Sequence, residues 1–413
     1  MPLRVDSDRL RSDFDALASF GALDDGGISR TTFSDAHLNA RAWFLDRARA
    51  AGLETRVDAA ANHSAILPAS APNAPTLLIG SHLDSVRRAG RYDGALGVLC
   101  ALEVLRTVKD AGHALPVTLE AIDFTDEEGT LVGTLGSWAL AGQLTDDMLG
   151  MPRGGRELLV AELERMGMTR SGMLAASRDP ATLVGFLELH IEQGPVLERA
   201  GIDIGIVTGI VGSSSFHVSF EGEPRHAGTT PMDGRRDAAL GAAAFVLGAH
   251  EIVTRDFPGC VATVGDVAIE PGSFNVVPGT ARLLLECRAL DAAELTALES
   301  ALGDRARSEA AAFGLDVVVE RVGRWEPTLT DSRFRAAFAA AAAALDLSTM
   351  ELPSGAGHDA QALAPITATG VVFVPSAGGI SHDPREYTSW QECVHGANVL
   401  LGATVELAVA PAT

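Results

Sequence analysis

Short apolar runs alternate with helical patterns along the first part of the chain. Thr76–Gly80 and Val117–Phe124 are apolar runs typical of buried strands, and Leu96–Val108, between them, repeats with a helical period. A strand, a helix and a second strand in this order predict a mostly parallel α/β sheet. Two helical patterns precede these runs, one at Asp8–Leu17 and one that begins after Ser34, a suitable N-cap residue.

The hydrophobic period changes in the middle of the chain. Residues 211–325 follow the order strand, helix, strand, strand, helix, strand, which is the order of a ferredoxin-like α+β unit. An Ala-rich helical pattern at Asp331–Leu345 and an apolar strand at Gly370–Val374 then return to the α/β pattern. We therefore predict one α/β domain made of residues 1–210 and 326–413, with the α+β domain of residues 211–325 inserted into it.

Composition excludes several classes of protein. A chain of 413 residues with 47% hydrophobic and 21% charged residues is expected to fold into about two globular domains rather than to be disordered. No apolar run approaches the roughly 20 residues that span a bilayer, and the N-terminus lacks the apolar core of a signal peptide. A net charge of −22 argues against nucleic acid and anionic membranes as partners, and requires a local cation if the substrate is an anion.

The cysteines indicate the compartment. None of the four forms a Cys-x-x-Cys pair, and scattered single cysteines are typical of free thiols in a reducing environment. We therefore expect a cytoplasmic protein. The four are Cys100, Cys260, Cys287 and Cys393.

Histidines and carboxylates gather where strand patterns give way to turns. Open α/β sheets bind their ligands at the carboxyl ends of the strands. Imidazole nitrogens together with carboxylate oxygens suit a borderline divalent metal ion. Five candidate ligands exceed the three that one catalytic zinc usually takes from protein, so two ions about 3.5–4 Å apart, bridged by a carboxylate, are the natural arrangement. The five are His82, Asp93, Glu128, His190 and His382.

Each of these residues also has a structural interpretation. A single histidine at the end of a strand is more often structural than a ligand, but Asp84 lies two residues from His82 and can orient its imidazole. Glu127 and Glu128 could form an exposed turn. Adjacent carboxylates point in different directions, however, so that Glu128 can bind metal while Glu127 faces the substrate water as a general base.

These motifs and several others occur in an order that resembles the M20 metallopeptidase-like amidohydrolases, and among them the hydantoinase/carbamoylase branch. The resemblance extends from about residue 8 to residue 405, and the hexapeptide that starts at His190 separates this branch from the wider family. The shared segments are His82-Leu83-Asp84, Asp93-Gly94, Asp126-Glu127-Glu128-Gly129, His190-Ile191-Glu192-Gln193-Gly194-Pro195, His226-Ala227-Gly228-Thr229-Thr230-Pro231-Met232, Asn275-Val276-Val277-Pro278-Gly279, Ser354-Gly355-Ala356-Gly357-His358-Asp359-Ala360 and His382.

The resemblance implies a fold and a metal centre. A catalytic α/β domain would carry two divalent ions, with zinc first and manganese, cobalt or nickel as alternatives, and the inserted ferredoxin-like domain would serve as a lid and as the contact of a homodimer. Asp93 would bridge the two ions. His82 and His190 would complete one site, and Glu128 and His382 the other.

Roles in substrate binding also follow from the resemblance. Arg288 would bind the α-carboxylate of the substrate, for which its planar guanidinium is suited. His226, often supplied by the partner subunit in this family, would stabilise the oxyanion of the tetrahedral intermediate. Gln193, Asn275 and His358 would make further substrate contacts.

The expected reaction is hydrolysis of the carbamoyl (ureido) C–N bond of an N-carbamoyl-L-amino acid by metal-bound hydroxide, with Glu127 as general base. The products would be the amino acid, ammonia and carbon dioxide. Allantoate amidohydrolase and β-ureidopropionase are alternatives within the branch, and a catalytically silent binding protein of the same fold is an alternative outside it. Ser213-Ser214-Ser215 and Thr130–Leu135 depart from the usual pattern, which affects the side-chain pocket rather than the metal ligands.

Overall fold

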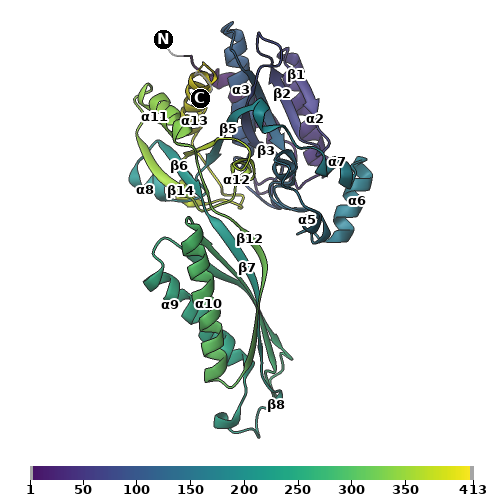
Figure 1. Ribbon diagram of the computed structural model, residues 1–413, viewed down its shortest axis with the longest axis vertical. Coiled ribbons are helices and arrows are strands. Elements are labelled where there is room, and N and C mark those ends of the chain that lie inside the picture. The colour runs from purple at the N-terminus through teal and green to yellow at the C-terminus, as the bar shows by residue number, and fades with distance from the viewer. Residues whose placement is uncertain (1–2, 410–413) are drawn as a thin grey trace. The chain divides into compact units, whose positions relative to one another are not determined.

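The computed structural model describes residues 3–409, and the chain forms two compact units (Figure 1). Unit 1 comprises Met1–Thr208 and Thr330–Thr413, and unit 2 comprises Gly209–Leu329. The fold is mixed α/β with a separate four-stranded antiparallel sheet, so the predicted fold class is confirmed.

The main sheet has nine strands. Its order is β1-β2-β4-β3-β5-β15-β6-β13, and β14 also pairs with β6. The strands are β1 (Glu54–Val57), β2 (His63–Leu67), β3 (Thr76–His82), β4 (Thr118–Phe124), β5 (Leu183–Ile191), β6 (Ile204–Ile210), β13 (Thr328–Leu329), β14 (Thr349–Ser354) and β15 (Thr369–Val374).

Only the centre of this sheet is parallel. β4, β3, β5 and β15 run parallel to one another, whereas the pairings of β1 with β2, β2 with β4, β15 with β6 and β6 with β13 are antiparallel. The prediction of a mostly parallel sheet was therefore wrong for the outer strands. β1 and β2 are joined by a turn of five residues, which is too short for the crossover that a parallel pair requires.

One large core supports the parallel strands. The helix α3 is buried at every residue from Ala95 to Val108, and it packs against β3, α1 and α13. The predicted N-cap Ser34 accepts a hydrogen bond from the backbone N–H of His37 at the start of α2. The helices of this core are α1 (Ser7–Leu17), α2 (Asp35–Ala50), α3 (Ala95–Asp110), α11 (Ser332–Ala343) and α13 (Trp390–Val409).

A smaller core lies under the segment that follows the predicted general base. Its buried members include Leu131, Leu135, Leu159 and Met173, together with Phe33 from the N-terminal segment. The short helices of unit 1 are α4 (Leu135–Leu140), α5 (Asp146–Gly150), α6 (Arg156–Met166), α7 (Arg170–Leu174), α8 (Val196–Ala200) and α12 (Asp359–Leu363).

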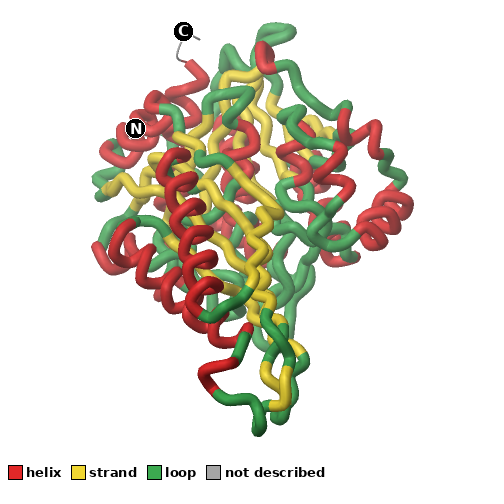
Figure 2. The backbone as a smooth tube through the Cα atoms, turned by 60° about the horizontal axis from the view of Figure 1, so that its bottom comes forward, coloured by secondary structure: helices red, strands yellow, loops and turns green. Residues whose placement is uncertain are grey.

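Unit 2 is ferredoxin-like, as predicted. Its strands pair antiparallel in the order β12-β7-β11-β9, which is the fourth, first, third and second strand along this unit. Two helices pack on one face of this sheet (Figures 1 and 2), where alternate residues such as Phe216, Val218 and Phe220 are buried. The elements are β7 (Gly212–Glu221), α9 (Ala238–Asp256), β9 (Val261–Glu270), β11 (Thr280–Ala289), α10 (Ala292–Ala312) and β12 (Asp316–Trp325), with a small ribbon of β8 (Arg225–His226) and β10 (Val276–Val277).

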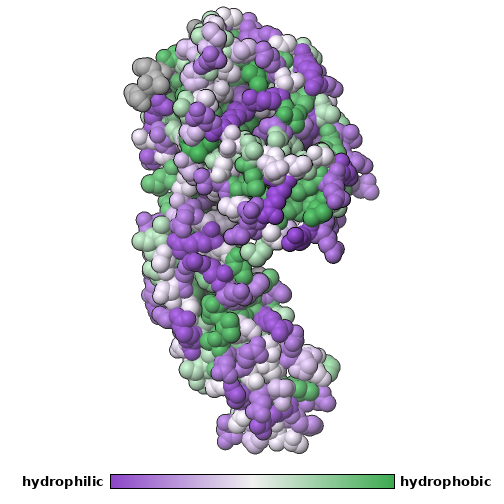
Figure 3. All heavy atoms as spheres, turned by 45° about the vertical axis from the view of Figure 1, so that its right-hand side comes forward, coloured by the Kyte–Doolittle hydropathy of each residue, from purple (hydrophilic) through white to green (hydrophobic). Residues whose placement is uncertain are grey.

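The surface and the thiols agree with a globular protein. Hydrophilic and hydrophobic residues are interspersed over the face in Figure 3. Among residues 3–409 no helix has both the length and the apolar character needed to cross a bilayer. All four cysteines are free and buried.

Candidate metal centre

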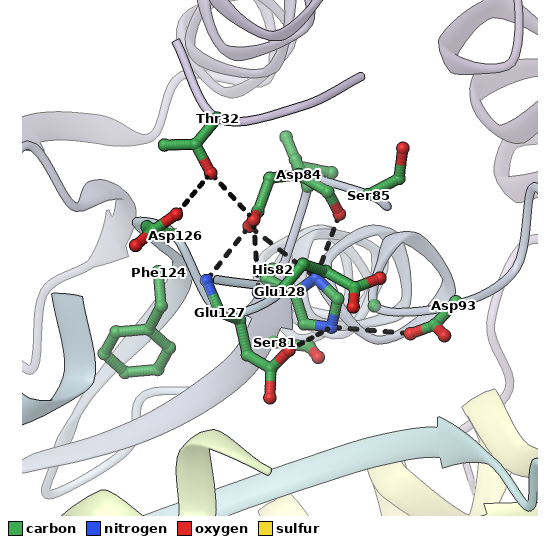
Figure 4. A network of polar contacts seen from close by, with 12 residues as sticks. Thr32, Ser81, His82, Asp84, Ser85, Asp93, Phe124, Asp126, Glu127 and Glu128 are labelled. Carbon is green, nitrogen blue, oxygen red and sulfur yellow. Dashed lines mark hydrogen bonds and ion pairs between the residues drawn. The ribbon is translucent and has the colours of Figure 1, made fainter. Parts of the chain in front are cut away.

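The predicted metal ligands lie at the carboxyl ends of the four parallel strands. His82 is the last residue of β3, and Glu128 follows the end of β4. His190 lies near the end of β5, and His382 lies in the loop after β15. Asp93 comes from the turn that precedes α3. Since neighbouring parallel strands end at one edge of the sheet, the fold brings these distant segments together. Figure 4 shows His82, Asp93 and Glu128 among them.

The five side chains form two groups that share Asp93. Its Oδ1 lies 3.1 Å from Nε2 of His190 and 3.5 Å from Nε2 of His82. Its Oδ2 lies 3.3 Å from Nε2 of His382, and the same nitrogen lies 3.4 Å from Oε2 of Glu128. In each group the potential ligand atoms all lie within 4.8 Å of one another. Each carboxylate oxygen of Asp93 therefore faces a different group.

The spacing and the tautomers fit divalent cations. Tetrahedral ligands with bonds of about 2.0–2.1 Å are about 3.3 Å apart, close to the separations found here. Nδ1 of His82 lies 3.0 Å from the carbonyl oxygen of Asp84, and Nδ1 of His190 lies 2.9 Å from that of Ile191. A carbonyl only accepts, so both Nδ1 atoms carry a hydrogen, and in the neutral ring each Nε2 offers a lone pair.

Asp84 supports the site in a different way from the one predicted. Its backbone carbonyl, rather than its carboxylate, orients His82, because Nδ1 of His82 is 3.8 Å from Oδ1 of Asp84. The carboxylate instead accepts hydrogen bonds from the backbone N–H groups of Glu127 (3.3 Å) and Glu128 (3.2 Å), and its Oδ2 lies 3.0 Å from the hydroxyl oxygen of Thr32 (Figure 4). Asp84 thus positions the peptide that carries the predicted base and one predicted ligand.

Asp126 holds the loop that follows. Its buried carboxylate accepts from the backbone N–H groups of Leu131 and Gly133, each at 2.9 Å, from that of Val132 at 2.6 Å, and from the hydroxyl of Thr32 at 2.8 Å. Our sequence interpretation gave no role to Asp126 or Thr32. The position of Asp126 directly before Glu127 was a usable signal, whereas Thr32 lies 94 residues away and had none.

Burial and neighbouring charges shift the pKa values of the carboxylates in the site. Burial raises the pKa of Glu127 well above its ordinary value, opposed by His82 and reinforced by Asp359. Burial and the charge of Asp93 raise the pKa of Glu128 to about 7. For Asp93, burial is outweighed by hydrogen bonds from the histidines, which hold its pKa well below the ordinary range. Cations bound here would stabilise the ionised carboxylates.

Glu127 lies beside the first group without belonging to it. Its Oε2 is 3.6 Å from Nε2 of His82, and its side chain is 13% exposed. The arrangement therefore offers ligand atoms for cations and, next to them, a further carboxylate within reach of a water molecule.

Two predicted substrate-binding residues lie in unit 1. Nε2 of Gln193 donates to Oδ2 of Asp93 (2.8 Å) and to Oγ of Ser381 (3.1 Å). His358 is buried, its ring centroid is 4.7 Å from that of His190, and its Nε2 lies 2.8 Å from Oγ of Ser354. Burial lowers the pKa of His358 well below its ordinary value. Both residues contact members of the two groups or their immediate neighbours.

The other three belong to unit 2. His226 is exposed, and its Nδ1 accepts from the backbone N–H groups of Gly228 (3.1 Å) and Thr229 (3.2 Å), so that Nε2 carries the hydrogen and is a donor. Asn275 accepts from the hydroxyl of Ser273 at 2.9 Å. Arg288, on β11, pairs with Glu286 at 2.7 Å.

Comparisons with known proteins agree with these features. The model of peptidase family M20/M25/M40 matches residues 78–406. The N-carbamoyl-L-amino acid amidohydrolase of Geobacillus stearothermophilus is 36% identical over 98% of this chain and 99% of that protein. The allantoate amidohydrolase of Bacillus subtilis is 33% identical over 95% of each chain. The crystal structure of a hydantoinase/carbamoylase family amidase from Burkholderia multivorans superposes with a TM-score of 0.89, at 34% identity and over 99% of each chain.

Proposed function

The chain belongs to peptidase family M20/M25/M40 and, within it, to the hydantoinase/carbamoylase amidases, and from this premise we propose that it hydrolyses N-carbamoyl-L-amino acids. The family acts on C–N bonds as amidohydrolases and uses divalent metal. The proposed reaction converts the carbamoyl amino acid and water into the amino acid, ammonia and carbon dioxide. The observation that carries this proposal is the pair of ligand groups that share Asp93, with Glu127 beside them.

We assign the two groups to two divalent ions, zinc first and manganese, cobalt or nickel as alternatives. His82 and His190 would hold one ion, Glu128 and His382 the other, and Asp93 would contribute one oxygen to each. When bound, the ions polarise the carbamoyl carbonyl and make a water molecule more acidic. Glu127 takes a proton from that water on its carboxylate and passes it to the leaving nitrogen.

The inserted domain would supply substrate recognition. Arg288 would exchange Glu286 for the carboxylate of the substrate, which meets the need for a local cation in a chain of net charge −22. Nε2 of His226 would donate to the developing oxyanion, from the partner subunit of a homodimer formed through this domain. Asn275, Gln193 and His358 would complete the substrate site.

Allantoate is the second candidate substrate, favoured by the similarity to the Bacillus subtilis enzyme. It also combines a carboxylate with ureido groups, so the same residues would serve. A β-ureido acid, as for a β-ureidopropionase, places the carboxylate one carbon farther from the ureido nitrogen, which would move it relative to Arg288.

Ammonia release decides among these reactions. Chelator-treated protein, reconstituted in turn with zinc, manganese, cobalt and nickel, is supplied with N-carbamoyl-L-amino acids, N-carbamoyl-β-alanine, allantoate and dipeptides. We expect the highest kcat/KM for an N-carbamoyl-L-amino acid. A higher value for allantoate would transfer the assignment to that substrate, and binding without turnover would favour a silent relative.

A further inference from the structure

Glu386 joins the loop of Asp93 to the loop of His382. Its Oε1 accepts from the backbone N–H groups of Tyr92 (2.9 Å) and Asp93 (3.1 Å), and its Oε2 accepts from the hydroxyl of Ser381 (2.8 Å). The residue is only 4% exposed.

The chain makes room for this carboxylate at Gly90. A Cβ atom at that position would lie 2.2 Å from Cβ and 2.3 Å from Oε1 of Glu386. Any other residue would therefore displace Glu386. The Glu386 side chain therefore fills a defined space above Gly90, unlike a charged side chain on the surface.

The hydroxyl of Ser381 lies between two carboxylates. Its Oγ is 2.8 Å from Oε2 of Glu386 and 3.1 Å from Oδ2 of Asp93. It has one hydrogen to donate, and the shorter distance assigns that hydrogen to Glu386. Oδ2 of Asp93 accepts instead from Nε2 of Gln193, at 2.8 Å. A carboxylate oxygen has two lone pairs, so one of those on Oδ2 remains for a cation.

We propose that Glu386 is a positioning residue that turns the Ser381 hydroxyl away from Asp93 and so keeps Oδ2 available to the ion held with Glu128 and His382. The inference rests on the proposed two-ion function. It gives Glu386 a directional role, since the residue would determine where one hydrogen points as well as hold two loops together.

Replacing the acid by its amide tests this direction. In Glu386→Gln the amide oxygen must face the N–H groups of Tyr92 and Asp93. An amide nitrogen in that place is itself a donor and could not accept their hydrogen bonds. The amide nitrogen then faces Ser381, which must accept, and its hydrogen turns toward Oδ2 of Asp93. A hydrogen in that place competes with a cation.

The expected defect is confined to one ion. The ion that His82 and His190 would hold faces Oδ1 of Asp93, so its affinity should be the same in Glu386→Gln and in the wild type. The second equivalent should bind about 10–100-fold more weakly, the usual effect of losing support behind a ligand. Adding Ser381→Ala removes the competing hydrogen, so Glu386→Gln/Ser381→Ala should recover most of the affinity.

The measurement is a cobalt(II) titration of chelator-treated full-length protein at mildly alkaline pH, followed by visible absorption and by metal content after gel filtration. It compares wild type, both single variants, the double variant and Asp331→Asn. The last is a matched acid-to-amide control, since Asp331 also accepts from two backbone N–H groups, at the start of α11. Recovery in the double variant would support the proposal and exclude misfolding as the cause.

Two results would overturn it. If Glu386→Gln bound the second equivalent with wild-type affinity, Glu386 would have no directional role. If the double variant bound the second equivalent as weakly as Glu386→Gln, Glu386 would only contribute to packing. A wild type that takes up a single equivalent would contradict the two-ion function itself, and the proposal with it.

Discussion

A methyl group at residue 94 tests whether the position of His82 matters. Gly94 directly follows Asp93 and precedes α3, with φ of 63°. A Cβ atom there would lie 2.4 Å from Cε1 and Nδ1 and 2.5 Å from Nε2 of His82. The ring cannot turn away freely, because its Nδ1 is bonded to the carbonyl of Asp84 at 3.0 Å. Gly94→Ala must therefore push a predicted metal ligand out of place.

The magnitude has two parts. Placing alanine in the left-handed α region costs about 1–2 kcal/mol of the free energy of unfolding, and the cost is at least this large at Gly94, whose ψ of −49° lies outside that region. To reach an ordinary contact of 3.4 Å from the 2.4 Å of the added Cβ, the ring must move by about 1 Å, their difference. A displacement of this size in a catalytic site costs about 10²-fold in rate.

Gly112 separates the two parts. It follows the other end of α3 with φ of 67°, and an added Cβ would meet nothing within 4 Å. Gly112→Ala should lose about 1–2 kcal/mol in urea unfolding, and Gly94→Ala should lose more, because its Cβ also overlaps the ring of His82. Only Gly94→Ala should also lose about 10²-fold in kcat/KM and bind its first metal equivalent more weakly. If the two variants turned over substrate and bound metal alike, His82 would not be needed where the structure places it.

Four further outcomes follow from the proposed roles. Glu127→Gln should lower kcat by about 10²–10⁴-fold with unchanged metal content, since only proton transfer is lost; a wild-type rate would remove Glu127 from the mechanism. Arg288→Lys keeps the charge but loses the planar fork and should mainly raise KM for carboxylate-bearing substrates, whereas His226→Ala should mainly lower kcat, by about 10²–10³-fold. Subunit exchange between His226→Ala and Glu127→Gln proteins should restore activity if His226 acts across the dimer, and mixed dimers that form but stay inactive would place it in its own subunit's site.

The parts of the fold that a local pattern determines could be predicted. Apolar runs identified the central strands, and the change of period located the ferredoxin-like unit. The antiparallel outer strands could not be predicted in the same way, because β1 is largely exposed and has no apolar pattern. Its partner is chosen by the short turn to β2 rather than by any periodicity.

In the site, the sequence could indicate candidate residues but not the hydrogen bonds that give other residues their roles. Histidine and carboxylates at strand ends carry a chemical signal of their own, so the ligand candidates could be selected from the sequence. The roles of Thr32, Asp126 and Glu386 depend on hydrogen bonds between segments up to 294 residues apart, and no local motif records such bonds. For Asp84 the spacing indicated the residue, but only the structure shows that its carbonyl orients His82 while its carboxylate positions Glu127 and Glu128.

The metal content of Asp93→Ala distinguishes a shared carboxylate from two independent sites. Each carboxylate oxygen of Asp93 faces one ligand group, so its removal should weaken both sites at once. After reconstitution and gel filtration, the account predicts two divalent ions per chain in the wild type and in Glu127→Gln, and the loss of tight binding of both in Asp93→Ala. Two ions retained by Asp93→Ala would contradict the shared site on which the proposed function depends.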